Sequence, residues 1–360
     1  MKYITEYRNK DRVRTLLDHI HAYTGPDLHF MEVCGGHTMA IHRFGIPSML
    51  PSSITLVSGP GCPVCVTSLG FVDHAIALSR RNDVIITTYG DLIRVPGSTS
   101  SLEKEKSQGR DIRMVYSTLE ALAIARDNPS RQVVFPGIGF ETTAPASAVA
   151  LEQARKENLR NFHILSAHKI MPPAMNAIVD EEVTLNGYLA PGHVSTVTGS
   201  DIYRDISETW RLPVVVSGFE PVDILQSIYM LIRQHVTGDI KVEIQYKRVV
   251  KPEGNLKARQ LMNRVFELRD DWWRGLGVLP GSGLGVGPDY AEWDAERNFD
   301  VDIEPTREPK GCICGDVLKG VSRPEECPLY GKVCNPANPV GTCMVSEEGA
   351  CQASYKYGTV

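Results

Sequence analysis

The sequence predicts an α/β protein of two lobes, each built on a mostly parallel sheet flanked by helices, with a cysteine-rich C-terminal region. Short apolar runs alternate with helical patterns about nine times between residues 29 and 250, which is typical of βαβ units and parallel sheets. So many strands exceed one small domain, and two lobes are the natural division. Six of the nine cysteines follow within residues 312–351, among prolines and glycines that offer little apolar core. Such a segment is usually held together by metal or by disulfides.

The predicted division of the chain has three parts. Residues 1–115 form a first α/β lobe that carries reactive thiols, and residues 116–250 form a second α/β lobe. Residues 251–360 form a helical, cysteine-rich iron–sulfur domain.

The first half of the chain gives these elements from local patterns. Residues 9–22 place four apolar side chains on one stripe, which predicts an amphipathic helix. Residues 66–81 are predicted to be helical, and the polar residues 97–110 are predicted to form a surface loop. Short strands are predicted at His29–Val33, Ile54–Val57, Val84–Thr88 and Met114–Tyr116.

The second half repeats the same alternation. A capping box at residues 117–120 precedes an alanine- and leucine-rich helix. Residues 255–275 are predicted to be helical, and the glycine-rich residues 275–288 are predicted to be mobile. Trp272 and Trp273 are interpreted as packing residues or as a docking patch. Further strands are predicted at Gln132–Phe135, Phe162–Leu165, Gly187–Ala190, Pro213–Val216 and Lys241–Val250.

The composition excludes several classes of function. A net charge of −5 and a pI near 6.1 argue against nucleic acid or an anionic membrane as the main partner. The first twenty residues are polar, and no apolar run is long enough to cross a membrane, so a cytoplasmic location is expected. There, cysteines serve metals or redox chemistry more often than structural disulfides. No G-x-x-x-x-G-K-[ST] motif occurs, so nucleotide binding has no support from a motif.

Unusual polar and sulfur side chains follow directly after predicted strands. Because ligands bind at the carboxyl ends of strands in open parallel sheets, these residues are expected to converge in a cleft between the lobes. Taken singly, each histidine and glutamate is more often a hydrogen-bonded structural residue, and the threonine can instead cap the next helix. The candidates are Cys34, His37, Cys62, Cys65, Glu141, Thr142, His168, His193 and Glu220.

Cys62 and Cys65 form a C-x-x-C pair at the start of a predicted helix. A helix N-terminus favours the thiolate, and the preceding Gly-Pro-Gly predicts an exposed turn rather than a buried, inert pair. Cys34 adds a third thiol, and His37 is a candidate fourth donor or proton carrier. Soft thiolates bind iron, zinc or copper(I), and the spacing leaves both structural zinc and transiently loaded iron open.

The six C-terminal cysteines suit an iron–sulfur cluster. Four thiolates can hold a [4Fe–4S] cluster, and two further thiols beside it can form a reducible disulfide. A structural zinc site is the alternative, and the spacing alone does not choose the four ligands. The cysteines are Cys312, Cys314, Cys327, Cys334, Cys343 and Cys351.

Together these motifs resemble the hydrogenase maturation factor HypD family, over nearly the whole chain. The resemblance implies two α/β lobes with a C-terminal [4Fe–4S] region, and a role in building the Fe(CN)2(CO) group of [NiFe]-hydrogenases. It also implies a scaffold complex with HypC, and delivery of cyanide-derived ligands by HypE, which HypF charges. The motifs are Cys34-Gly-Gly-His-Thr38, Gly59-Pro-Gly-Cys-Pro-Val-Cys65, Gly139-Phe-Glu-Thr-Thr-Ala-Pro145, Ser166-Ala-His-Lys169, Pro191-Gly-His193 and the cysteine tail.

The same resemblance assigns roles to residues. Cys34 looks like the thiol that holds the Fe(II) in transit, which carries cyanide and CO, and Cys62 and Cys65 look like a redox-active pair at the same cleft that also contacts this iron. The tail is similar to ferredoxin:thioredoxin reductase, in which a cluster lies beside a disulfide, and this likeness pairs Cys314 with Cys343. The cluster ligands on that likeness are Cys312, Cys327, Cys334 and Cys351. Such a chain is a redox-active assembly protein rather than a conventional turnover enzyme.

Two other functions fit the thiols. A free-standing iron–sulfur thiol–disulfide oxidoreductase would reduce protein disulfides without needing Cys34 or bound iron. A zinc-stabilised interaction protein would use the cysteine tail for structure alone.

Overall fold

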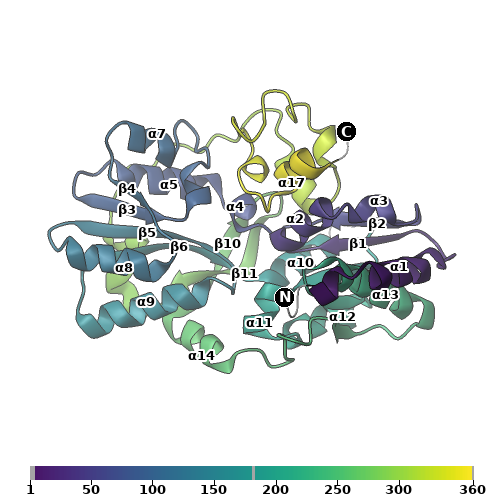
Figure 1. Ribbon diagram of the computed structural model, residues 1–360. Helices are drawn as coiled ribbons and strands as arrows, with labels where there is room; N and C mark the ends of the chain where they lie inside the picture. The colour runs from purple at the N-terminus through teal and green to yellow at the C-terminus, as the bar shows by residue number, and fades with distance from the viewer. Residues whose placement is uncertain (1–4, 181–182, 359–360) are drawn as a thin grey trace.

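The computed structural model describes residues 5–180 and 183–358. Two mostly parallel sheets flanked by helices form two lobes, and the cysteine-rich tail packs beside them without joining either sheet (Figure 1). The predicted α/β class is therefore confirmed. No helix among residues 5–180 and 183–358 is long and apolar enough to span a membrane.

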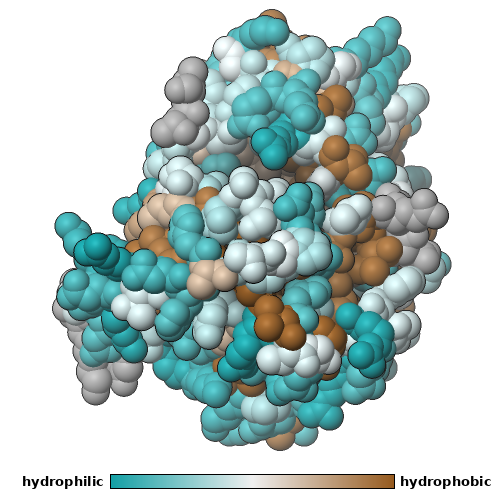
Figure 2. Space-filling model, turned by 90° about the vertical axis from the view of Figure 1, so that its right-hand side faces the viewer, coloured by the Kyte–Doolittle hydropathy of each residue, from teal (hydrophilic) through white to brown (hydrophobic). Residues whose placement is uncertain are grey.

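The first lobe is built on a five-stranded parallel sheet in the order β2-β1-β7-β8-β9. Helices α1 (Lys10–His21), α2 (Gly35–Arg43) and α13 (Pro221–Thr237) cover one face with aliphatic side chains. The outer surface of this lobe is mostly hydrophilic, with hydrophobic residues in separate small patches (Figure 2). The strands are β1 (Leu28–Glu32), β2 (Ile54–Ser58), β7 (Gly187–Pro191), β8 (Val214–Ser217) and β9 (Val242–Ile244).

The second lobe is built on a six-stranded sheet in the order β10-β11-β6-β5-β3-β4. Helices α8 (Thr118–Asp127) and α9 (Ala144–Glu157) pack on one face, and α5 (Leu69–Ser79) contributes to the core on the other. Only β11 runs against the direction of the other strands, since it is antiparallel to both of its neighbours, β10 and β6. The strands are β3 (Val84–Thr88), β4 (Ile112–Met114), β5 (Gln132–Gly139), β6 (Phe162–Lys169), β10 (Phe266–Trp273) and β11 (Gly277–Val286).

The chain passes between the lobes three times, after β2, after β6 and after β9. Each sheet therefore combines two separate stretches of sequence, and the expected division at residues 115 and 116 cuts through the second sheet. The alternation of strand and helix patterns in the sequence predicts the number of strands, but it does not predict which strands pair.

Four local predictions differ from the structure, and the first three concern residues 241–288. Helix α14 (Leu256–Val265) ends ten residues before the predicted end, and β10 follows it at once. The glycine-rich segment forms β11, and residues 282–287 are buried rather than mobile. Its glycines permit this packing, since a Cβ at Gly283 would lie 2.7 Å from the Cβ of Asp271 on β10. The strand predicted at Lys241–Val250 is much shorter in the structure, where β9 comprises only the three residues Val242–Ile244.

The predicted surface loop at residues 97–110 contains a short helix, α7 (Leu102–Ser107). Leu102 is fully buried, and the carboxylate of Glu105 accepts hydrogen bonds from Arg80 and from Ser100. The burial of Leu102 and the ion pair of Arg80 with Glu105 hold this segment against the lobe, so it is not an open loop.

The tail consists of short helices and turns that lie against both lobes. Helix α17 (Ala350–Tyr357) packs on α2, and α16 (Cys314–Lys319) packs on α4 (Pro63–Val66) and on β2. The 3-10 turn η5 (Thr342–Met344) also contacts α4. The tail therefore meets the loops that follow β1 and β2 (Figure 1).

Candidate functional site

Two cysteine motifs meet at the carboxyl ends of β1 and β2. Cys34 is the N-cap residue of α2, and the N–H of Gly35 donates to the carbonyl of Gly61 at 2.9 Å. A Cβ at Gly61 would lie 2.1 Å from the backbone nitrogen of Cys34, so only glycine fits this approach. Because β1 and β2 are parallel neighbours, their loops bring the backbone of Cys34 against Gly61, the residue before Cys62.

All three thiols at this place are buried. Cys34 is 9% exposed, Cys62 3% and Cys65 0%, so the prediction of an exposed Gly-Pro-Gly turn is wrong. The tail covers part of this site, because Glu348 packs on Gly35 and η5 packs on α4. Burial, with a smaller effect of the Glu348 charge, raises the pKa of Cys34 to about 12. Burial also raises the pKa of Cys65 well above its ordinary value.

The ring of His37 has one free lone pair. Its Nε2 lies 3.2 Å from the carbonyl oxygen of Ser217 and 3.0 Å from that of Gly218, so Nε2 carries the hydrogen that is donated. Nδ1 is then the unprotonated nitrogen, and it has no hydrogen-bond partner in the part of the chain that the structure describes. Burial lowers the pKa of His37 to about 4, which keeps this lone pair available.

A stack of three rings bounds the site on the side of the first sheet. Phe219 stacks on His37 at a centroid distance of 4.6 Å and on His193 at 3.9 Å. These residues follow β1, β7 and β8, which are neighbours in the sheet. His193 is exposed and His37 is buried, so Phe219 separates the inner imidazole from the solvent. Sequence reasoning missed Phe219, although a glycine-flanked aromatic after a strand resembles the other strand-end motifs.

The remaining cleft candidates occupy different environments. Glu141 is buried, and its Oε1 accepts the N–H of Met171 at 3.2 Å, while Oε2 lacks a partner among residues 5–180 and 183–358. Burial raises the pKa of Glu141 to about 7. Thr142 is exposed, and Glu220 accepts a hydrogen bond of 2.9 Å from Arg8.

His168 lies inside the second lobe, and both of its ring nitrogens have partners. Nδ1 lies 3.1 Å from the hydroxyl of Ser166, and Nε2 lies 3.2 Å from that of Ser147. Burial lowers the pKa of His168 to about 3. Because each ring nitrogen has a hydrogen-bond partner, this environment matches the alternative interpretation of His168 as a hydrogen-bonded structural residue.

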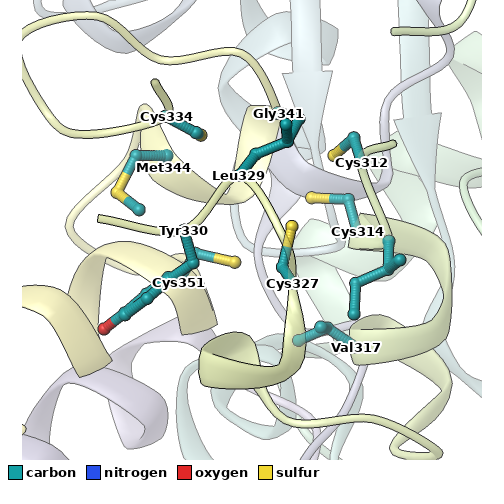
Figure 3. Close-up of a pocket in the computed structure, with 11 residues that line it drawn as sticks. Cys312, Cys314, Val317, Cys327, Leu329, Tyr330, Cys334, Gly341, Met344 and Cys351 are labelled. Atoms are coloured by element: carbon teal, nitrogen blue, oxygen red, sulfur yellow. The ribbon is translucent and has the colours of Figure 1, made fainter. Parts of the chain in front are cut away.

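Five of the six C-terminal cysteines line one pocket. Figure 3 shows their sulfurs facing a common space from loops and from the first turns of α16 and α17. The other lining side chains are uncharged, and Leu329, Tyr330 and Met344 are the largest of them. The pocket lining therefore combines sulfur ligands with uncharged, mostly apolar side chains, and this combination suits an iron–sulfur cluster. The five cysteines are Cys312, Cys314, Cys327, Cys334 and Cys351.

Cys343 lies between this pocket and the C-x-x-C pair. Its backbone N–H donates to the sulfur of Cys314 at 3.3 Å, and its thiol lies near enough to those of Cys65 and Cys351 to influence the pKa of each. The neighbouring Thr342 donates its hydroxyl to the carbonyl of Cys65 at 3.2 Å. The two groups of sulfurs are therefore continuous through Cys343.

The thiols are not arranged around a single metal ion. No three Cys, His, Asp or Glu side chains among the described residues stand close enough together to hold one ion. A [4Fe–4S] cluster is larger than one ion and takes one thiolate per iron. The donor set of the tail pocket fits such a cluster by its chemistry.

Comparison with known proteins identifies the family. A sequence profile described as "HypD: Hydrogenase formation hypA family" matches residues 11–358. The chain is 48% identical to the hydrogenase maturation factor HypD of Azotobacter vinelandii, over 99% of this chain and 97% of that protein. It is 43% identical to HypD of Escherichia coli K12, over 99% and 98%, and 46% identical to a putative hydrogenase expression/formation protein of Methanocaldococcus jannaschii, over 92% of each. The chain therefore belongs to the HypD family of hydrogenase maturation factors.

Proposed function

We propose that this chain acts in the cytoplasm, with HypC, as the scaffold on which the Fe(CN)2(CO) group of [NiFe]-hydrogenase is assembled. Family membership and one observation support the proposal: Cys343 lies between the buried C-x-x-C pair, whose Cys65 carbonyl accepts the hydroxyl of Thr342, and a pocket lined by five further cysteines, of which Cys314 accepts the N–H of Cys343. HypE, charged by HypF, is the proposed donor of the cyanide-derived ligands.

The iron under assembly is the substrate of the scaffold. Cys34 is the proposed principal ligand, with Cys62 and Cys65 as further thiolates and the free Nδ1 of His37 as a nitrogen donor or proton acceptor. Because no three such donors among the described residues stand close enough for one ion in the metal-free chain, iron binding has to draw them together. Thiolates keep the iron electron-rich, which favours binding of cyanide and CO. Metal binding requires the thiolate, so loss of the Cys34 proton, whose pKa is about 12 in the metal-free chain, accompanies iron binding.

The tail pocket is the proposed site of a resident [4Fe–4S] cluster with Cys312, Cys327, Cys334 and Cys351 as its ligands. When bound, the cluster supplies single electrons. The fifth lining thiol, Cys314, accepts the backbone N–H of Cys343 at 3.3 Å, which supports the proposed assignment of these two as the spare pair. The thiol of Cys351 also lies near Cys343.

The order of contacts supports a route for disulfide exchange. The thiol of Cys343 attacks a Cys62–Cys65 disulfide at Cys65, so the Cys343–Cys65 bond forms and Cys62 leaves as a thiol. Cys314 then attacks Cys343, which releases Cys65 and leaves a Cys314–Cys343 disulfide. Two electrons and two protons move from one cysteine pair to the other, and an external donor must restore the spare pair one electron at a time.

Replacing Cys34 with alanine tests the scaffold directly. We expect wild-type chain co-purified with HypC without oxygen to show infrared bands of iron-bound cyanide and CO, and we expect Cys34→Ala to show none. Size-exclusion chromatography supplies the control, because the variant must still bind HypC. Bands of wild-type intensity in Cys34→Ala would exclude Cys34 as the iron ligand.

Replacing Cys314 with serine tests the exchange route. With the cluster present, we expect the Cys62–Cys65 disulfide to be reduced at least about tenfold more slowly in Cys314→Ser, since a mixed disulfide at Cys343 can no longer be resolved. Thiol alkylation followed by mass spectrometry measures the reduced fraction over time. An unchanged rate at equal iron content would contradict this route.

The second candidate is a free-standing thiol–disulfide oxidoreductase, which the contact between Cys65 and Cys343 also favours. Such a protein would reduce a disulfide of another protein without Cys34. Equal turnover of a protein disulfide by wild type and Cys34→Ala, with no cyanide or CO bands in either, would favour this function.

A further inference from the structure

An open groove of about 350 Å³ lies on the second lobe, where the start of α5 meets β6, β10 and β11. It shares no lining residue with the tail pocket, and its volume is within the range of pockets that bind small ligands. Ser68, the N-cap residue of α5, lines the groove and lies three residues after Cys65. The groove therefore begins beside the helix that carries the C-x-x-C pair.

One part of the groove is apolar. Phe71 and Trp272 contribute aromatic rings, and Leu165 and Val278 contribute aliphatic side chains. Trp272 and Val278 face each other across β10 and β11, and Val278 is 63% exposed. Trp273, by contrast, is fully buried in the core. Of the two adjacent tryptophans, one is thus a packing residue, and the other forms part of a surface groove.

The charged side chains of the groove leave one negative charge without a partner. Arg269 donates to the carboxylate of Glu296 at 2.6 Å, so its guanidinium is already paired. Asp271 is paired with the buried ammonium of Lys169 at 2.8 Å. Asp270 also lines the groove, is exposed, and has no ion-pair partner in the part of the chain that the structure describes. The groove therefore favours a cation.

The wall formed by α5 carries a nitrogen without a hydrogen-bond partner. Nε2 of His74 is buried and has none among residues 5–180 and 183–358. Burial lowers the pKa of His74, while the charge of Glu296 opposes this effect, so the imidazole is neutral at pH 7. Buried polar atoms of native proteins are nearly always paired. An N–H group that enters the groove would supply the missing partner.

We propose that this groove is a docking site for an arginine side chain of a protein partner, which it holds beside the C-x-x-C helix. The aliphatic stem of an arginine suits the apolar part, and its planar guanidinium stacks on a tryptophan ring such as that of Trp272. Its several N–H donors match the two groups that lack partners, the carboxylate of Asp270 and Nε2 of His74. Arginine is also a common anchor residue of protein interfaces.

Two matched peptides test the proposal on the full chain. One is acetyl-glycyl-arginyl-glycine amide, and the other carries citrulline, whose neutral urea replaces the guanidinium. We expect the citrulline peptide to bind at least about tenfold more weakly to wild type. We expect Asp270→Asn and Trp272→Leu each to weaken binding of the arginine peptide about fivefold. Asp289→Asn is the control, because it removes another exposed carboxylate of the same lobe that does not line the groove. Titration by saturation-transfer NMR measures the affinities.

The position of the bound peptide is measured separately. We expect the indole N–H signal of Trp272 to shift on addition of the arginine peptide and to stay in place with the citrulline peptide. Absence of binding, equal affinity for the two peptides, or wild-type affinity in both Asp270→Asn and Trp272→Leu would overturn the inference. Free L-arginine that binds tenfold more tightly than the peptide would indicate a small-molecule site and overturn docking. These variants leave all nine cysteines in place, so the scaffold function is tested independently.

Discussion

Replacing Cys327 with alanine is expected to remove the visible absorption and about four irons per chain from protein purified without oxygen. The sulfur of Cys327 faces the common space in the tail pocket, and a cluster that loses one of four thiolates has no protein ligand for one iron (Figure 3). Replacing Cys314 with serine is expected to leave both iron and absorption in place. Iron, sulfide and zinc analysis of the two variants measures the difference.

Comparing these two variants distinguishes a cluster ligand from a spare thiol, because both cysteines line the same pocket. Cys312→Ala, Cys334→Ala and Cys351→Ala should behave like Cys327→Ala. If Cys314→Ser lost the iron and Cys327→Ala kept it, the proposed ligand set would be wrong. Colourless wild-type protein with bound zinc would support the structural zinc site in its place.

Replacing Gly61 with alanine is expected to lower the free energy of unfolding by about 3 kcal/mol. The added methyl group would meet three backbone atoms of Val33 and Cys34 within 2.4 Å, and backbone cannot turn aside as a flexible side chain can. The loops after β1 and β2 would have to separate, so iron binding at Cys34 should fall as well. Urea denaturation of the metal-free chain, followed by circular dichroism without oxygen, measures the first effect.

Gly70→Ala is the control for this substitution. Gly70 lies within α5, where the nearest atom to an added Cβ is the hydroxyl of Thr306 at 3.3 Å, and alanine is the better helix former. We expect its unfolding midpoint to stay close to that of wild type. A Gly61→Ala chain as stable as Gly70→Ala would contradict the close contact between the two cysteine loops.

Individual strands could be predicted from the sequence because buried strands of parallel sheets are short apolar runs. Val84–Thr88 was predicted with its observed bounds, and seven other strands were found within a few residues. The antiparallel pair β10 and β11 was missed, since its alternation of glycine and apolar residues resembles a flexible segment until Gly283 is seen against Asp271. The pairing of β1 with β7 could not be predicted, because nothing local in Phe30 or Gly187 encodes it.

The proximity of the first cysteines in the folded chain could also be predicted in part. Placement after strands indicated that the loops of Cys34 and Cys62 would meet, and their backbones do meet at Gly61. The depth at which these thiols are buried could not be predicted, because part of their cover comes from Glu348 and η5, which lie far along the chain. Arg274, which is buried and donates its Nε to the carbonyl of Cys65 at 3.1 Å, was missed for a similar reason. An arginine before glycine in a turn usually faces solvent, and this carbonyl belongs to a helix far away in the sequence.

The interleaved lobes have a consequence for biosynthesis. Phe30 of β1 pairs with Gly187 of β7, so the first sheet cannot close until that much more chain has left the ribosome, which takes roughly ten seconds or longer. The first three cysteines are made early, and the residues that cover them, such as Glu348, are made last. During this interval the thiols of the nascent chain stay open to oxygen and to stray metal ions. Slow translation in air should therefore damage this protein before it has folded.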